Sequence, residues 1–314
     1  MKPSVLVTGR IPSAVIGRLE EKFQVDVYIG DSPIKPEELK QRICGKQAVV
    51  CLITENIDSS VINAGQALRV IANVGVGYNN IDVSAAHDKG IVVTNTPNVL
   101  TEATADLTWA LILGITRRIG ESERFLRHGN WKDWKFDLML GMQLHGKQLG
   151  IVGFGRIGQA VAARAKPFGM YATYTSRSVK PVVNAKPMPL EQLLSTSDVI
   201  SLHVPLTAET RHLIDKKAIA HMKKTAYLIN TSRGPIVDEV ALTWALEEHL
   251  IAGAALDVFE HEPNVHKPLL SLDNVLLTPH IGSGTVETRT AMADLAALNV
   301  IEVLSGNSPL TPVL

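Results

Sequence analysis

The chain has 314 residues, 46% of which are hydrophobic, and its 31 Lys and Arg residues balance its 31 Asp and Glu residues. A chain of this length and apolar content is long enough for about two domains, each with its own core. The net charge of zero gives no basis for binding nucleic acid or an anionic membrane surface, so neither partner is expected.

No targeting segment, membrane span or metal site is expected either. Residues 2–8 lack the long apolar core of a signal peptide and have the pattern of a first strand. The longest apolar stretch, residues 107–115, is too short to cross a bilayer. The only cysteines, Cys44 and Cys51, lack the spacing of metal ligands, and so few thiols indicate a reducing compartment. We therefore expect a soluble protein of the cytoplasm.

Residues 4–95 alternate between strand and helix patterns. Strands are predicted at 5–8, 25–28, 48–53, 70–74 and 91–94, and helices at 12–23, 36–43, 59–64 and 82–89. This alternation is typical of a parallel sheet with helices on both faces. Because the segment contains no phosphate-binding glycine pattern, it is predicted to be a flavodoxin-like domain that does not bind a nucleotide.

A long helix is predicted at residues 101–118. It is apolar almost all round, so we expect it to be buried and to cross between domains. Residues 120–145 then form a long connection in which Trp131 and Trp134 lie among polar residues. Composition leaves two interpretations of this connection open, a packed surface loop and a contact between subunits.

The alternation resumes in the second half of the chain. Strands are predicted at 149–152, 171–175, 199–202, 226–230, 254–258 and 275–278, and helices at 159–168, 190–195, 216–221 and 239–248. A last helix, at 285–304, is apolar on most faces, so it should be buried, and it could pack back on the first domain. The pattern predicts a second parallel sheet covered by helices.

The strand at 149–152 ends in a G-x-G-x-x-G pattern, Gly153-Phe154-Gly155-Arg156-Ile157-Gly158. In a strand–turn–helix context, the first glycine permits a tight turn, the second lets the backbone approach a pyrophosphate, and the third lets the helix pack on the strand. The N–H groups that begin the helix would hold the phosphates. We predict a dinucleotide site here; a purely structural turn is the alternative.

The end of the next strand indicates which dinucleotide is bound. Enzymes that use NAD commonly carry an Asp or Glu about 20 residues after the glycines, for the ribose hydroxyls. This chain has Ser176, Arg177 and Ser178 there, which could bind a 2′-phosphate through hydroxyls and a guanidinium. NADP(H) is therefore the predicted cofactor, with NAD(H) as the alternative if Arg177 is solvated or only stacks on the adenine.

Three charged side chains follow neighbouring strands of the second sheet. Arg233 follows the strand at 226–230, Glu262 the strand at 254–258, and His280 the strand at 275–278. Ligands of parallel sheets bind beyond the carboxyl ends of the strands, so the three could converge. His280 could donate a proton to a ketone, Glu262 could orient the imidazolium, and Arg233 could bind a carboxylate or a carbonyl oxygen. Each residue alone could equally be structural.

Taken together, these motifs resemble those of the D-isomer-specific 2-hydroxyacid dehydrogenases, most closely the glyoxylate/hydroxypyruvate reductase branch. The resemblance covers essentially the whole chain. It is carried by residues 74–82 (VGVGYNNID), 95–97 (NTP), 101–106 (TEATAD), 150–158 (GIVGFGRIG), 230–234 (NTSRG), 257–263 (DVFEHEP) and 278–282 (TPHIG).

The resemblance implies roles for individual residues. Arg233, Glu262 and His280 would be catalytic, and the backbone N–H groups of Val76 and Gly77 would hold the substrate carboxylate together with Arg233 and His280. Positions that match cofactor contacts in the family are Thr104, Gly153, Gly155, Arg156, Ile157, Gly158, Ser176, Arg177, Ser178, Val204, Pro205, Thr210, Thr231, Ser232, Arg233, Asp257, His280 and Gly282. The resemblance also implies a homodimer joined through the nucleotide domains. In related reductases a Trp from the loop before the glycine motif reaches the partner's active site, but the segment from Trp134 to Leu138 does not place that Trp here.

The expected fold is α/β, with two doubly wound parallel-sheet domains and a cleft between them. A flavodoxin-like substrate domain would comprise residues 1–98 and 286–314, and a Rossmann domain residues 99–285. The expected reaction is the NADPH-dependent reduction of small 2-keto acids, glyoxylate to glycolate and hydroxypyruvate to D-glycerate. The alternatives are a larger 2-keto acid such as 2-ketogluconate, or a nucleotide-sensing binding protein like the corepressors that share this fold.

Overall fold

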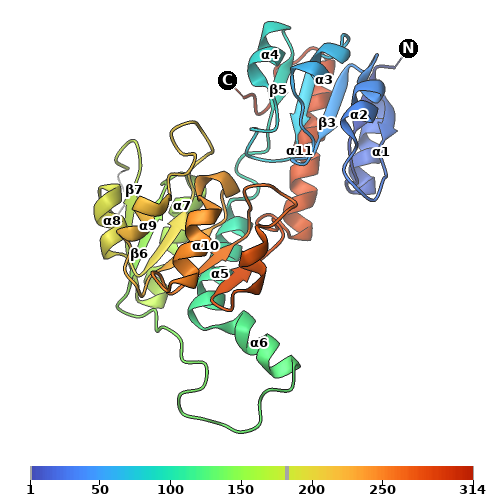
Figure 1. The fold of residues 1–314 in the computed structure, drawn as a ribbon. Helices are drawn as coiled ribbons and strands as arrows, with labels where there is room; N and C mark the ends of the chain where they lie inside the picture. Colours follow the sequence, from blue (N-terminus) through green and yellow to red (C-terminus); the bar gives the residue numbers. More distant parts are fainter. Residues whose placement is uncertain (1, 181–183, 314) are drawn as a thin grey trace. The chain divides into compact units, whose positions relative to one another are not determined.

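A computed structural model describes residues 2–180 and 184–313 (Figure 1). The backbone contacts divide the chain into two compact units. Unit 1 comprises the described residues up to Leu100 together with those from Ser283 onward, and unit 2 comprises Thr101–Gly282. Among the described residues, no helix combines the length and the apolarity needed to span a membrane.

Unit 1 is built around a parallel five-stranded sheet in the order β2-β1-β3-β4-β5. Its strands are β1 (Ser4–Val7), β2 (Gln24–Val27), β3 (Ala48–Cys51), β4 (Val70–Asn73) and β5 (Val92–Thr94). Its helices are α1 (Ser13–Lys22), α2 (Pro36–Ile43), α3 (Ser59–Ala64), α4 (Val83–Asp88) and α11 (Val286–Leu304). The strands β3 and β4 are buried at every residue, because helices cover both faces of a parallel sheet.

Local sequence signals set where several of these helices begin. Asp58 precedes α3, and its carboxylate accepts hydrogen bonds from the N–H groups of Ser60 and Val61. Asp82 caps α4 in the same way through the N–H group of Ala85. These side chains satisfy N–H groups that have no partner within their helix, which fixes the helix start.

The helix α11 completes unit 1 although it lies far along the chain from the other elements. It packs against α1 and against the strands β3, β4 and β5. The carbonyl of Val303 accepts a hydrogen bond from Arg69 (3.1 Å), and Asn299 binds the N–H groups of Leu310 and Thr311. The segment that follows the helix then reaches the edge strand β5, where Thr94 pairs with Pro312.

Unit 2 contains a parallel seven-stranded sheet in the order β12-β11-β10-β9-β6-β7-β8. Its strands are β6 (Gln148–Val152), β7 (Tyr171–Thr175), β8 (Ala185–Pro187), β9 (Val199–Leu202), β10 (Tyr227–Asn230), β11 (Gly253–Leu256) and β12 (Val275–Leu277). Its helices are α5 (Thr101–Thr116), α6 (Ile119–Arg127), α7 (Arg156–Ala163), α8 (Leu190–Thr196), α9 (Lys216–Ala220) and α10 (Glu239–Glu247), with 3₁₀ turns at Lys166–Phe168, Gly234–Ile236 and Lys267–Ser271. The strand order reverses between β6 and β9, and ligands bind beyond the carboxyl ends of strands at such a reversal.

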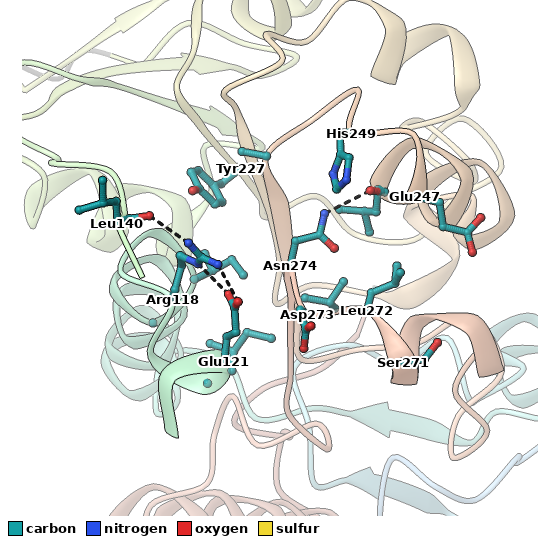
Figure 2. Close-up of a pocket in the computed structure, with 17 residues that line it drawn as sticks. Arg118, Glu121, Leu140, Tyr227, Glu247, His249, Ser271, Leu272, Asp273 and Asn274 are labelled. Atoms are coloured by element: carbon teal, nitrogen blue, oxygen red, sulfur yellow. Dashed lines mark hydrogen bonds and ion pairs between the residues drawn. The ribbon is translucent and has the colours of Figure 1, made fainter. Parts of the chain in front are cut away.

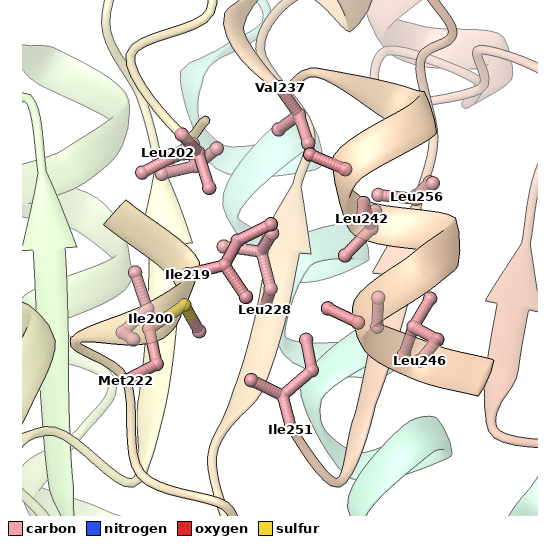
Figure 3. Close-up of a cluster of buried hydrophobic side chains, with 14 of the residues drawn as sticks. Ile200, Leu202, Ile219, Met222, Leu228, Val237, Leu242, Leu246, Ile251 and Leu256 are labelled. Carbon is pink, nitrogen blue, oxygen red and sulfur yellow. The ribbon is translucent and has the colours of Figure 1, made fainter. Parts of the chain in front are cut away.

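The two faces of this sheet are covered by separate apolar clusters. On one face, Ile200 and Leu228 of the sheet meet Leu242 and Leu246 of α10, and all four side chains are buried (Figure 3). On the other face, α5 lies against β10, β11 and β12 and contributes the buried side chain of Ile112. Both units are therefore α/β units with a parallel sheet, which confirms the predicted fold class.

The prediction of a helix at 159–168 was wrong in its limits. The helix α7 begins at Arg156, directly after the N-cap residue Gly155, and it ends at Ala163. Pro167 cannot continue an α-helix because its ring clashes with the carbonyl four residues earlier. A short 3₁₀ turn follows instead, and Gly169 ends it with a φ of 67°.

The connection predicted at 120–145 begins with a helix that the sequence pattern did not reveal, α6. Arg118, with a φ of 53°, separates α5 from α6 and pairs with Glu121 at 2.6 Å. No residue of α6 is buried, so its apolar positions do not mark a core face in the sequence. The edge strand β8 was also missed, because it has three residues and ends in a proline.

Candidate active site

The glycine turn after β6 can be formed only by glycine at two of its positions. Gly153 has a φ of 96°, and its N–H group donates to the carbonyl of Thr175 at 2.9 Å. A Cβ atom there would lie 2.6 Å from the backbone of His203. At Gly158, a Cβ atom would overlap the carbonyl oxygen of Gly153, so the absence of a side chain lets α7 pack against the turn.

The second glycine of the pattern, Gly155, leaves the start of α7 open. It is exposed, and no heavy atom lies within 4 Å of the position that a Cβ atom would take. The first residues of the helix, Arg156 and Ile157, have no side-chain cap before them. An uncapped helix start beside an open glycine is the arrangement that binds the phosphates of a dinucleotide, so these residues fit such a cofactor.

The loop after β9 lies beside this turn. The backbone N of Val204 would be 2.7 Å from a Cβ atom at Gly153, which places the start of the loop against the glycines. Further along, Thr210 donates from Oγ1 to the carbonyl of Pro205 (2.6 Å) and accepts the N–H of Thr207 (2.8 Å). The structure thus places Val204, Pro205 and Thr210 in one loop that borders the glycine turn.

Ser176, Arg177 and Ser178 follow β7 and are all exposed. The Ser176 hydroxyl donates to the carbonyl of Ser178 at 2.6 Å, which closes a tight turn around Arg177. A cavity of about 300 Å³ opens next to this turn. It is lined by Tyr174, Thr175, Ser176, Val179, Pro187, Met188 and Pro189.

Glu262 and His280 are in direct contact at the carboxyl end of the sheet. Glu262 Oε2 lies 2.7 Å from His280 Nδ1, and Glu262 Oε1 accepts the N–H of Phe259 at 3.0 Å. His280 has a φ of 51°, a strained conformation for a residue with a side chain, and its N–H donates to the carbonyl of Asp257 at 2.8 Å. The carboxylate therefore fixes the ring and leaves Nε2 as the nitrogen directed away from Glu262.

The charges around this pair perturb one another. Burial raises the pKa of Glu262, but the hydrogen bond and charge of His280, then the Phe259 N–H and Arg233, hold that pKa below its ordinary value overall. Burial lowers the pKa of Arg233, and the nearby Glu262 carboxylate acts in the opposite direction. An arginine stays charged despite such a shift, so a cation and an anion face the same region.

A network of hydroxyl and carboxylate groups surrounds the turn at residues 278–282. Asp257 is 1% exposed and accepts hydrogen bonds from Thr278 Oγ1, Ile281 N and Gly282 N at 2.7–2.8 Å. Burial raises the pKa of Asp257, and these hydrogen bonds act against that rise. Three of the roughly four lone-pair sites of its carboxylate are thus used to hold the turn that carries His280.

The remaining predicted residues of unit 2 lie next to this network. A Cβ atom at Gly282 would be 3.3 Å from Asp257 and 3.5 Å from Thr104. Thr231 Oγ1 lies 3.0 Å from the hydroxyl of Thr108, which in turn donates to the carbonyl of Thr104. The Ser232 hydroxyl donates to the side chain of Asn230, whose amide donates to the carbonyl of Arg233 (2.9 Å). The supporting roles of Thr108 and Asn230 were not predicted, since buried polar residues at helix and strand positions carry no distinctive pattern.

Val76 and Gly77 belong to unit 1, in the loop after β4. Asn95 donates to the carbonyl of Val76, and Asn73 donates to the carbonyl of Gly77, both at 2.8 Å. Two asparagine side chains therefore hold the backbone of this loop in one conformation.

A further cavity, of about 620 Å³, lies in unit 2, at the end of the sheet opposite the one that carries Glu262 and His280 (Figure 2). It opens where β10 and β12 begin, between Tyr227, Asn274 and the ion pair of Arg118 with Glu121. No sequence pattern indicated it, and it contains none of the predicted site residues. Across residues 2–180 and 184–313, no group of three or more His, Cys, Asp or Glu side chains is arranged to hold a metal ion.

Comparison with known proteins identifies the family. Residues 109–282 match the model of the NAD-binding domain of D-isomer-specific 2-hydroxyacid dehydrogenases. The chain belongs to this family. A glyoxylate reductase of Thermococcus onnurineus is 48% identical over 100% of this chain and 96% of its own length. The predicted family is thereby confirmed.

Solved structures agree with the assignment of this chain to the 2-hydroxyacid dehydrogenases. A crystal structure of a Thermus thermophilus protein superposes with a TM-score of 0.94 at 45% identity, covering 99% of this chain and 100% of that one. The NADPH-dependent glyoxylate/hydroxypyruvate reductase of Sinorhizobium meliloti, solved with NADP and malonate, has a TM-score of 0.89 at 36% identity over 100% of this chain and 97% of its own. This dehydrogenase is accordingly an oxidoreductase, and the prediction of a nicotinamide dinucleotide cofactor is confirmed.

Proposed function

We propose that this dehydrogenase reduces small 2-keto acids with NADPH, glyoxylate to glycolate and hydroxypyruvate to D-glycerate. The observation that carries the proposal is the contact of Glu262 with His280 beside the Arg233 cation. The names of the relatives, glyoxylate reductase and glyoxylate/hydroxypyruvate reductase, support the choice of substrates.

Three side chains of unit 2 have separate roles in the proposed reduction. A reduced nicotinamide, when bound, supplies the hydride for the carbonyl carbon. His280 donates a proton from Nε2 to the carbonyl oxygen, because Nδ1 is held by Glu262. Glu262 keeps the ring in this orientation through its contact with Nδ1. Arg233 binds the carbonyl oxygen and the acid group with its planar fork of donors.

Backbone and hydroxyl groups complete the proposed binding sites. In unit 1, the N–H groups of Val76 and Gly77 bind the substrate carboxylate. In unit 2, the residues proposed to bind the dinucleotide are Thr104, Gly153, Gly155, Arg156, Ile157, Gly158, Ser176, Arg177, Ser178, Val204, Pro205, Thr210, Thr231, Ser232, Arg233, Asp257, His280 and Gly282.

The experiment that tests the proposal measures oxidation of NADPH and of NADH with glyoxylate and with hydroxypyruvate. We expect turnover of both keto acids, with NADPH preferred. Turnover of 2-ketogluconate but of neither small keto acid would contradict the substrate assignment. Binding of NADPH without turnover of any keto acid would contradict the enzyme assignment.

We expect the replacement of Arg177 by Ala to lower the preference for NADPH over NADH by about tenfold to 150-fold. One charge-assisted hydrogen bond to the 2′-phosphate contributes about 1.5–3 kcal/mol, which corresponds to that range. The measurement is kcat/KM for each cofactor at saturating keto acid. An Arg164→Ala variant is the matched control, since Arg164 pairs with Glu102 and Asp106 instead. An unchanged cofactor ratio in Arg177→Ala would show that the 2′-phosphate is bound elsewhere.

We further propose that the protein is a homodimer and that residues 128–142 form part of the interface. This segment exposes large aromatic side chains: Trp131 is 54% exposed, Trp134 75% and Phe136 84%. Contiguous apolar surface of this kind marks a protein–protein contact when nothing in the same chain covers it. The interface would bury these rings against a second copy.

We expect the double replacement Trp134→Glu with Phe136→Glu to shift the protein from dimer to monomer in analytical ultracentrifugation. The two new carboxylates, at positions 134 and 136, would have to be buried in the interface without a cationic partner, which is costly. An Ile29→Glu variant is the control, because Ile29 is 69% exposed but lies in unit 1. A wild-type protein that sediments as a monomer at micromolar concentration would contradict the proposed dimer.

The proposal places the enzyme in the cytoplasm. Both cysteines are free thiols; Cys44 is exposed and Cys51 is buried. Burial, followed by the charge of Glu55, raises the pKa of Cys51 far above its ordinary value, so this thiol is unreactive. Free thiols persist in a reducing compartment, which supports this location.

A further inference from the structure

Glu239 is a buried carboxyl group that has no part in the mechanism described above. It is the first residue of α10 and is only 4% exposed. Buried acidic residues are rare and normally bind a specific partner, because burying a carboxylate is costly. The partner of Glu239 therefore indicates what the residue contributes.

That partner is the backbone of the segment that carries Glu262. Glu239 Oε1 accepts the N–H of Glu260 at 2.6 Å, two residues before Glu262 along the chain. The neighbouring N–H, that of Phe259, binds Glu262 itself, and Glu262 in turn binds His280. Glu239 is thus connected to the imidazole of His280 through the backbone of residues 259–260 and the carboxylate of Glu262.

Two other contacts border the same segment. The side chain of Glu260 pairs with His212, at 2.6 Å between Oε1 and Nε2. The backbone of Phe259 lies so close to Gly234 that a Cβ atom at Gly234 would overlap it. These contacts hold the side chain of Glu260 and the backbone of Phe259, but the partly buried hydrogen bond to the Glu260 N–H comes from Glu239.

We propose that Glu239 is a positioning residue for the catalytic pair: by binding the Glu260 N–H it holds the segment from Asp257 to Glu262 where Glu262 can reach His280. The proposal rests on the proposed function, because it gives Glu262 and His280 their roles in proton donation. Glu239 itself touches neither reactant.

The electrostatic surroundings of Glu239 indicate which replacement it tolerates. Burial raises the pKa of Glu239, and the Glu260 carboxylate adds to the rise, while the Glu260 N–H, His266 and His261 oppose it. The amide oxygen of a glutamine can accept the same hydrogen bond in the same volume without a charge. The acceptor atom, and not the charge, is therefore what the segment requires.

The test compares Glu239→Ala with Glu239→Gln and with Glu247→Ala, an exposed glutamate at the other end of α10. We expect Glu239→Ala to lower kcat by about tenfold to a hundredfold, since a displacement of about 1 Å at reacting groups has an effect of that size. The KM for NADPH should stay unchanged. Glu239→Gln and Glu247→Ala should both keep kcat close to that of the wild type.

The pH profile separates positioning from a loss of stability. In Glu239→Ala, the fall of kcat/KM on the acidic side should move to higher pH, because a displaced Glu262 loses the hydrogen bond and the charge of His280 that lower its pKa. A protein that is merely less stable would lose active molecules without moving the profile. A wild-type kcat and pH profile in Glu239→Ala would overturn the proposal, and so would a Glu239→Gln variant as impaired as Glu239→Ala.

A second measurement needs no turnover, so it decides about Glu239 even where the keto acid proposal fails. The ring nitrogens of His280 are observed by NMR in protein with ¹⁵N-labelled histidine, and their signals are assigned by their loss in His280→Ala. We expect the signal of a carboxylate-bound Nδ1–H in the wild type and in Glu239→Gln, and its loss in Glu239→Ala. Retention of that signal in Glu239→Ala would overturn the role assigned to Glu239.

Discussion

We expect the replacement of His280 by Ala to lower kcat for glyoxylate reduction by about 10²–10⁴-fold, which is the usual contribution of a general acid. Reduction of a ketone places negative charge on the carbonyl oxygen as the hydride arrives. The ring of His280 is held by Glu262 at 2.7 Å, so the proton on Nε2 is available without a search through side-chain rotamers. An alanine leaves water as the proton donor, in no fixed position.

The measurement for His280 is steady-state kinetics together with NADPH binding. The dissociation constant for NADPH should rise far less than kcat falls, because His280 is one of many groups proposed to bind the dinucleotide, whereas it is the one proposed proton donor. His221→Ala is the matched control. His221 also pairs with a carboxylate, that of Glu191 at 3.1 Å, but it directly follows α9 and is not among the proposed site residues. A His280→Ala variant within threefold of wild-type kcat would sink the assignment of the general acid.

We expect the replacement of Arg233 by Lys to lower kcat/KM for both keto acids by at least about tenfold to 150-fold. Arginine offers a planar fork that binds a carbonyl or carboxylate group through two parallel hydrogen bonds, whereas lysine offers a single point of charge. Each charge-assisted bond contributes about 1.5–3 kcal/mol, and at least one is lost. The new ammonium group would also be partly buried, as Arg233 is.

Separate values of KM and kcat for the Arg233→Lys variant distinguish an effect on keto acid binding from an effect on the reduction itself. A rise in the KM for the keto acid shows that Arg233 holds the substrate in the ground state, and a fall in kcat shows a contact that strengthens in the transition state. Arg164→Lys serves as control, because its two carboxylate partners are surface residues of unit 2. Unchanged kcat/KM in Arg233→Lys would exclude Arg233 from the site.

The central strands of both sheets were predictable because they are buried on both faces. The run at 199–202 and the run at 227–230 lie between helices, so they contain almost only apolar residues and stand out from the segments around them. The helix α6 has no such signal, because none of its residues is buried within the chain. Its first turn makes polar contacts such as the ion pair of Arg118 with Glu121, which a hydrophobic pattern does not reveal.

The candidate site residues that follow strands could be predicted from the sequence. The carboxylates that hold them in place by binding backbone N–H groups could not. The glycines and the charged residues after β10, β11 and β12 follow strands directly, so their positions could be derived from the chain order. The bond from the Glu260 N–H to Glu239 could not, since a glutamate at a helix start is equally expected as a favourable charge near the helix dipole. The same holds for Asp257, whose carboxylate binds Ile281 and Gly282 across 24 and 25 positions of sequence.

The return of α11 to unit 1 has a consequence for the order of events during synthesis. Unit 2 is one continuous stretch, Thr101–Gly282, so it can fold as soon as it has left the ribosome. Unit 1 cannot, because β3, β4 and β5 lack their cover until Val286–Leu304 has been made. The unit whose first hundred residues are translated first is thus completed last, and during that interval the apolar face of β4 is open to chaperones and to neighbouring nascent chains.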